Sequence, residues 1–391
     1  MKRLLFAGIF ILITLFSFSA EVIRYVDPDA TGTGTGLDWT NAYTSLSAWN
    51  TGEATNLVAD GDWHHVYCRA SSGTADTTTM SINGWTTGST HYILIEAADG
   101  DEALKDEWDD TRYAKGATNE TEITVTNDYV EIKGLQISGR ISITATTDIY
   151  NCRLKGTSSV GINISNSTTT VNIWNTIMTG TYYDGIVAGT STTVNVYNSV
   201  LAGATSDSIE YNSASGTCKN VVCYGAGTDF DIDGGSTVTV DYCAGVDGTG
   251  TNSVSFSGSD IDNELTDVST GDMTLLNTGN FYHGGASAPD SSLYTTDMEG
   301  DSYYSTAYSI GVDEYVAAST GIAVLRRRIM GYSSVFNFTN LLLLLNTISG
   351  YLLTHTMMKL RRVRKELLWY AKPENIKNLA IVEKYLEETH V

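Results

Sequence analysis

The chain has 391 residues, with 45 acidic against 23 basic residues, a formal net charge of −22, 37 glycines and only 3 prolines. This acidity argues against nucleic acid as a partner, because like charges repel, and it suits cations or neutral surfaces better. Abundant Gly, Thr, Ser and Asn is typical of short strands joined by tight corners.

Residues 1–20 are predicted to be a signal peptide. Lys2 and Arg3 precede an uninterrupted apolar run from Leu4 to Phe16, and small residues follow up to Ala20. We expect cleavage near Ala20. The alternative is an uncleaved membrane anchor, for which the apolar run is short.

Residues 21–62 are predicted to form an N-terminal cap. Four apolar side chains are available there to cover the first coil of a stack: Trp39, Tyr43, Leu46 and Trp49. An uncovered end of a stack is an exposed edge that invites aggregation, so a cap is expected.

Residues 63–316 are predicted to form a β-solenoid. Six segments in this region alternate apolar and polar residues, as half-buried strands do. Their apolar centres are spaced 17, 24, 23, 22 and 22 residues apart and lie at Ile132, Ile149, Ile173, Val196, Cys218 and Val240. Such a period indicates stacked coils, and the Val, Ile, Thr and Ser content favours an all-β right-handed parallel β-helix over a leucine-rich repeat.

Each strand is followed by a residue that tolerates a left-handed backbone, as a corner requires. The corner asparagines should therefore lie above one another as a hydrogen-bonded ladder of Asn151, Asn175, Asn198 and Asn220. Segments 254–256 and 273–275 are expected to continue the stack, and residues 280–315 to close it.

The five cysteines lack the spacing of metal ligands. Cys223 and Cys243 are about one coil apart and could meet in a disulfide. We favour the alternative, in which the cysteines are small buried hydrophobes.

The composition changes after residue 316. Residues 21–316 hold 40 acidic against 10 basic residues, whereas residues 317–391 hold 5 acidic against 11 basic residues. We predict a linker at 317–333, a transmembrane segment at 334–356, and a basic helical tail at 357–391 on the inner face of the membrane. Two alternatives are a buried or surface helix, and an unrelated reading frame joined to the solenoid.

Beyond the coils, three places carry a resemblance to a known family: Tyr25-Val26-Asp27, residues 36–46, and Ile310 to Tyr315. With them the chain resembles secreted right-handed parallel β-helix proteins of the pectate lyase-like superfamily, in particular surface β-helix proteins with a C-terminal anchor. The resemblance covers about residues 24 to 316 and implies an exported, anchored, carbohydrate-related module. The chain lacks the Asn-Thr-Asp and Gly-His-Gly elements of polygalacturonase-like members.

The most suggestive polar residues are acidic. Asp184, Asp207 and Asp229 are 23 and 22 residues apart, so stacking is expected to align them in an outer column. Alternation is also expected to put Asp229, Asp231 and Asp233 on one side of a strand, with Phe230 and Ile232 inside. Such carboxylates suit a calcium ion, or an acid and base acting on a sugar. The alternative is that they are ordinary solvent-facing turn residues.

Four aromatic residues near these carboxylates are expected to form a sugar-stacking platform: Trp174, Tyr182, Tyr183 and Tyr197. The alternative is that they pack beneath a loop. We therefore predict an exported cell-surface β-helix that binds a polysaccharide or envelope glycan without catalysis. Two alternatives are a calcium-assisted polysaccharide lyase or glycoside hydrolase, and a structural stalk.

Overall fold

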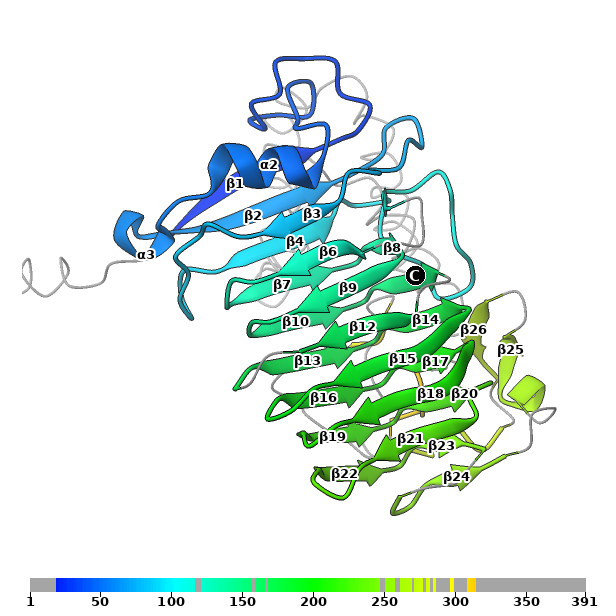
Figure 1. Ribbon diagram of the computed structural model, residues 1–391. Helices are drawn as coiled ribbons and strands as arrows, with labels where there is room; N and C mark the ends of the chain where they lie inside the picture. The colour runs from blue at the N-terminus through cyan, green and yellow to red at the C-terminus, as the bar shows by residue number, and fades with distance from the viewer. Residues whose placement is uncertain are drawn as a thin grey trace, which may run out of the picture. The chain divides into compact units, whose positions relative to one another are not determined.

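The computed structural model describes most of residues 19–313, all within the first of two units, Met1–Ala318. The residues not described inside this range are 117–120, 157–158, 166–167, 247–249, 257–260, 269–270, 277–278, 282–283, 286–295 and 299–307. The described residues form three parallel sheets of nine, eight and seven strands, and each full coil gives one strand to each sheet (Figure 1).

The first sheet contains β1 (Ala20–Val26), β2 (Asp62–Cys68), β4 (Ile93–Ala97), β7 (Val130–Lys133), β10 (Thr147–Tyr150), β13 (Thr170–Trp174), β16 (Thr193–Tyr197), β19 (Ser215–Lys219) and β22 (Thr237–Asp241). The second sheet contains β5 (Ala114–Lys115), β8 (Gln136–Ser138), β11 (Arg153–Gly156), β14 (Ile177–Gly180), β17 (Val200–Ala202), β20 (Val222–Tyr224), β23 (Ala244–Gly245) and β24 (Val254–Ser255). The third sheet contains β3 (Met80–Ile82), β6 (Thr121–Val125), β9 (Arg140–Ile143), β12 (Val160–Ile164), β15 (Tyr182–Ala188), β18 (Ala204–Tyr211) and β21 (Thr228–Ile232).

The strand registers confirm the parallel β-helix predicted from the repeat. Ile149 pairs with Ile132 on one side and Ile173 on the other, and the series continues through Val196 and Cys218 to Val240. The irregular first spacing of 17 residues is therefore a short coil and not a break in the stack.

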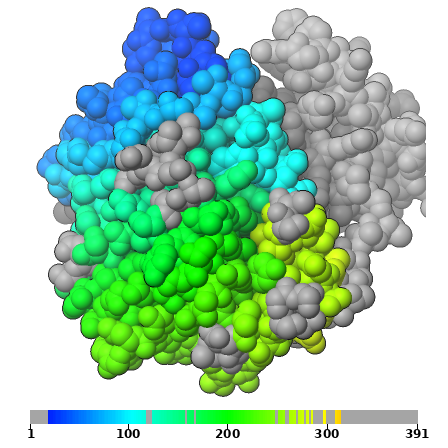
Figure 2. All heavy atoms as spheres, turned by 45° about the vertical axis from the view of Figure 1, so that its right-hand side comes forward, coloured from blue at the N-terminus to red at the C-terminus, as the bar shows by residue number. Residues whose placement is uncertain are grey.

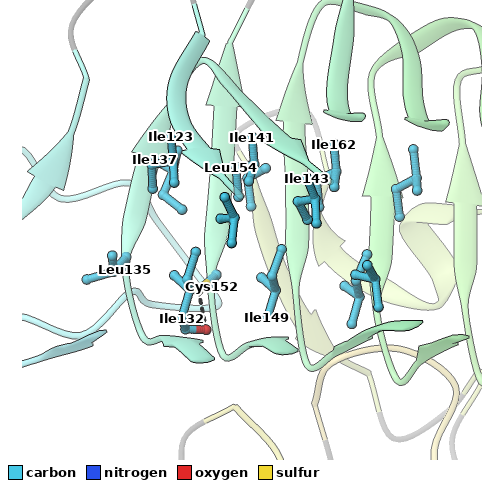
Figure 3. Close-up of a cluster of buried hydrophobic side chains, with 14 of the residues drawn as sticks. Ile123, Ile132, Leu135, Ile137, Ile141, Ile143, Ile149, Cys152, Leu154 and Ile162 are labelled. Carbon is cyan, nitrogen blue, oxygen red and sulfur yellow. Dashed lines mark hydrogen bonds between the residues drawn. The ribbon is translucent and has the colours of Figure 1, made fainter. Parts of the chain in front are cut away.

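Stacking builds one continuous apolar core between the three sheets. Figure 3 shows a part of it, where side chains from successive coils meet, among them Ile132, Ile149 and Leu154. All three are fully buried. Each fully buried side chain of this size stabilises the fold by about 1.5–3 kcal/mol, so the stack gains stability with every coil. All five cysteines are buried and free, as expected of small hydrophobes.

The corners after β10, β13, β16 and β19 have a left-handed backbone. Asn151, Asn175, Asn198 and Asn220 have φ of 54°, 50°, 44° and 56°. The side-chain amide of Asn175 donates to Asn151 Oδ1 at 3.2 Å, and that of Asn220 donates to Asn198 Oδ1 at 3.1 Å. The corner asparagines therefore lie above one another and pair across neighbouring coils, Asn151 with Asn175 and Asn198 with Asn220.

Helices α2 (Leu46–Glu53) and α3 (Leu57–Asp60) lie between β1 and β2. Helix α2 begins at Leu46 because the Ser45 hydroxyl accepts a hydrogen bond from the Ala48 backbone N–H at 3.0 Å. Leu46 and Trp49 are fully buried and join the core. Residues 20–26 pair with β2 as an added strand of the first sheet, so this part of the expected cap belongs to the stack.

The chain beyond the last coil turns back along the second sheet. The prediction that residues 273–275 continue the stack is wrong, because β25 (Leu265–Asp267) and β26 (Asp272–Leu275) pair antiparallel in a sheet of their own. The short helix η1 (Ile261–Asn263) precedes them. Figure 1 draws β25 and β26 beside the coils, and Figure 2 shows the same residues against the coil surface. We call the described parts of residues 261–313 the returning segment.

The returning segment is fixed by polar contacts with much earlier residues. Arg153, fully buried, donates to the carbonyl oxygens of Leu104 at 2.9 Å and Gly271 at 2.7 Å. Lys105 Nζ lies 2.6 Å from Asp313 Oδ1. Apolar residues of the segment cover outward side chains of the second sheet such as Val200 and Val222. Turning back thus buries a sheet face that would otherwise expose Val and Ile.

Predictions for the two ends of the chain fall largely outside the described residues. This holds for most of the signal peptide at 1–20 and for all of the segments at 317–333, 334–356 and 357–391. In the part of the chain that the structure describes, no helix has the length and apolar character needed to cross a membrane.

Candidate functional site

Most of the expected aromatic platform is packed inside the protein. Trp174 and Tyr197 are buried together with Tyr308 of the returning segment. The Tyr150 and Trp174 rings stack at 4.3 Å with an interplanar angle of 5°. Tyr182 is a core residue. Trp174 and Tyr197 therefore follow the alternative of packing beneath a later segment, Tyr182 lies in the core, and the platform prediction is wrong for all three.

Tyr183 alone of the four aromatic residues is open to solvent, with 62% of its surface exposed. It begins the outer face of β15 next to Asp184, so one ring and one carboxyl group remain of the expected constellation.

The acidic column is only partly formed. Asp184 pairs in register with Asp207, as equal spacing predicts, but Asp207 pairs with Thr228 and not with Asp229. One extra residue in β18, between the partners of Tyr182 and Asp184, brings Asp207 opposite Asp184. The next coil places Thr228 opposite Asp207, so Asp229 lies one position outside the column. Asp229 is only 1% exposed and lies inside, against the backbone of Gly245.

The predicted calcium ligands are not brought together. Asp229 is buried, whereas Asp231 and Asp233 are exposed, and Asp233 accepts hydrogen bonds from the backbone of Ser213 and Gly235 in a turn. Ile232 was expected inside but is 38% exposed, because β21 is the last strand of the third sheet and no further strand of that sheet covers it. Within residues 19–313 as described, no group of three or more His, Cys, Asp or Glu side chains could hold a metal ion. The residues present do not fit calcium.

Asp184 is chemically unusual. It is 8% exposed, and its Oδ1 atom is buried without a hydrogen-bond partner. Burial, together with the charges of Glu210 and Asp207, raises its pKa to about 6. Asp207 accepts a hydrogen bond from Ser206 Oγ at 2.7 Å. The Asp184 carboxyl group therefore keeps its proton to a higher pH than an isolated carboxyl group does.

A second cluster, which the sequence analysis missed, lies on the outer face of the first strands of the first sheet. Its aromatic members are half-buried and come from β1, β2, the residue before β4 and a loop: Tyr25, Trp39, Trp63, Tyr67 and Tyr92. We call these five rings the aromatic face. Alternation along β2 could have revealed it, because Trp63, His65 and Tyr67 share one side of the strand, where Trp63 and Tyr67 are half-buried and His65 is buried between them.

The rings of the aromatic face contact one another in a continuous series. Trp63 stacks on Tyr92 at 4.8 Å and 15°, Tyr25 lies over Tyr67 at 6.0 Å, and Tyr25 meets Trp39 at 4.6 Å. His65 links the two groups, at 5.5 Å from Trp63 and 4.0 Å from Tyr67. Half-buried rings held by such contacts form a rigid surface, which binds at little entropic cost.

Charged side chains fix the centre of this face. His65 Nδ1 lies 2.8 Å from Glu21 Oε1, and its Nε2 lies 2.8 Å from Glu96 Oε2. Glu96 also pairs with Lys133. Burial acts to lower the pKa of His65, but the hydrogen bonds to both glutamates outweigh it and the net shift is upward. The pKa of Glu96 is lowered, because the bonds to His65 and Lys133 outweigh the opposing effect of burial.

The outer face of the first sheet continues from the aromatic face as a polar row. Asn172 donates to Asp148 Oδ1 at 2.8 Å, and Asn195 donates to Asn172 Oδ1 at 3.0 Å. Glu131 lies in register with Asp148 at the start of this row. Rings followed by a line of amide and carboxylate oxygens suit a chain of sugar rings, which offers apolar faces and hydroxyl groups.

Comparison with known proteins gives a match at the level of structure only. Two solved chains match, one of them described as the crystal structure of pectate lyase Pel9A, with 13% identity and a TM-score of 0.34 over 76% of this chain and 97% of that one. No family model and no curated protein matches the sequence. The stacked registers confirm the predicted parallel β-helix.

Proposed function

We propose that this protein is an exported β-helix that binds glycans on the aromatic face. The observation that carries the proposal is the series of half-exposed rings from Tyr25 to Tyr92, held rigidly by mutual contacts on the outer face of the first sheet. Exposed rings in such number are costly to leave in water, and a sugar ring is a ligand whose apolar face would cover them.

The test is retention on a panel of insoluble neutral, acidic and amino polysaccharides. Trp63→Ala and Tyr92→Ala should each weaken binding by about tenfold, because one lost stacking contact is worth about 1–1.5 kcal/mol. Tyr183→Ala is the matched control, since it removes an exposed ring on the third sheet. Equal losses in the three variants, or no retention on any polysaccharide, would refute the proposal.

A second candidate function is acid–base hydrolysis of a glycan at Asp184 and Asp207. It is favoured by the raised pKa of Asp184 next to a second carboxylate, since glycoside hydrolysis needs a protonated acid and an ionised base. Release of reducing ends from the same panel, lost in Asp184→Asn and Asp207→Asn, would support this function. Retention without products would leave binding as the function.

We also propose that residues 334–356 anchor the protein to a membrane, with the β-helix outside. The support is the uncharged stretch there followed by a basic cluster from Lys359. Release of the β-helix from cell membranes by truncation after residue 316 would support the anchor, and unchanged membrane association would contradict it.

A further inference from the structure

The aromatic face is set in a strongly acidic body. Residues 21–316 hold 40 acidic and 10 basic residues, which gives −30. The cations nearest the rings have carboxylate partners: Arg69 lies over Trp39 and pairs with Asp27 at 2.8 Å, and Lys133 pairs with Glu96. These pairs neutralise the cations locally, so they contribute little attraction for an anionic ligand.

Carboxylates set the local potential at the rings. Burial, together with the charges of Glu96 and Glu21, raises the pKa of Tyr67 to about 12. Burial also raises the pKa of Tyr92, with Glu131 and Glu21 acting in the same direction. The charges that raise the pKa values of these two rings are negative, so the carboxylates around them favour a cationic ligand.

The geometry also places carboxylates where a bound cation would reach them. Glu21 lies in register with Trp63, and its side chain is 40% exposed beside the stacked pair of Trp63 and Tyr92. Glu131 lies in register with Leu94 on the neighbouring strand, and it accepts a hydrogen bond from the neutral phenol of Tyr150 at 3.0 Å. An ammonium group over an aromatic ring gains further from the negative ring face.

We infer that the glycan taken by the aromatic face carries free amino groups, as a polymer of non-acetylated hexosamine does. This inference rests on the proposed glycan binding and names its ligand class. The sugar ring would stack on Trp63 and Tyr92, while its ammonium group would lie near Glu21 or Glu131. The same carboxylates would repel an acidic glycan, so the site would discriminate between amino sugars and acidic sugars.

The test compares a soluble glucosamine hexamer with its fully N-acetylated counterpart, using the full chain at low ionic strength. We expect the free-amine hexamer to bind at least about tenfold more tightly, since a desolvated cation–π contact with a nearby carboxylate is worth that much. Glu21→Gln keeps an acceptor for His65 and should reduce this ratio without abolishing binding of the acetylated hexamer. Asp231→Asn, on the third sheet, is the control and should leave the ratio unchanged.

The outcomes separate this inference from the function on which it rests. Equal or tighter binding of the acetylated hexamer, or of polygalacturonate, overturns the preference for amino sugars and leaves glycan binding intact. Absence of binding to every glycan overturns both. Equally tight binding of oligolysine would show that charge alone is recognised, and it would overturn the assignment to a sugar.

Discussion

Replacing Asp184 by Asn should stabilise the protein above neutral pH. The carboxyl group has a pKa raised from 3.8 to about 6, so the folded protein prefers its protonated form and loses stability as the pH rises from about 4 to above 6. A shift of about two units corresponds to about 3 kcal/mol at most, and solvent near the group reduces this to about 1–2 kcal/mol. Asn resembles the protonated acid and does not ionise.

The assay is urea unfolding of the wild type and Asp184→Asn between about pH 4 and pH 8, the range that spans the pKa shift. The difference in unfolding free energy should be small at low pH and should favour the variant by about 1–2 kcal/mol at high pH. Asp231→Asn, an exposed carboxylate on the same sheet, should show no such dependence. A difference that is constant with pH, or that favours the wild type at pH 8, would refute the reasoning.

Three further variants test other parts of the structure. Asn175→Ala should cost about 2–4 kcal/mol of unfolding free energy, because it removes side-chain hydrogen bonds and strains a backbone with φ of 50°. Asn175→Gly should cost about half as much, because glycine relieves the strain. Equal costs for the two variants would contradict the argument from backbone strain. His65→Gln should be less stable than the wild type mainly below the ordinary histidine pKa of 6.5, because the charged ring forms ion pairs with Glu21 and Glu96. The difference in stability should fade as the pH rises through the raised pKa of His65. A stability difference that does not depend on pH would contradict this. Arg153→Met should make the returning segment more sensitive to limited proteolysis, since it removes the bonds to Leu104 and Gly271, and an unchanged digestion pattern would contradict that role.

Much of the fold could be predicted because it follows from local patterns that repeat. Alternation located the strands, the recurring asparagines located the corners, and equal spacing matched each strand to its neighbour, as the pairing of Ile173 with Val196 shows. These features depend on residues close in sequence, and each coil supplies the same evidence again.

The predictions of site residues were wrong where the structure depends on contacts between residues that are distant in sequence. Trp174 and Tyr197 appeared outward by alternation, and they are outward from the core, but Tyr308, more than one hundred residues later in the sequence, covers them. Asp229 lies one position outside the column, because Asp207 pairs with Thr228, and spacing alone does not reveal this register. The aromatic face was missed because its rings lie on irregular early coils, where no repeat draws attention to Trp63 or Tyr92.

The central claim is that the aromatic face holds a sugar chain by its rings. A crystal structure of the full chain soaked with glucosamine hexamer tests it most directly. The account predicts density for a sugar ring stacked on Trp63 and Tyr92, with its amino group near Glu21 or Glu131. Density for the sugar at Asp184 and Asp207 instead, with an empty aromatic face, would contradict it.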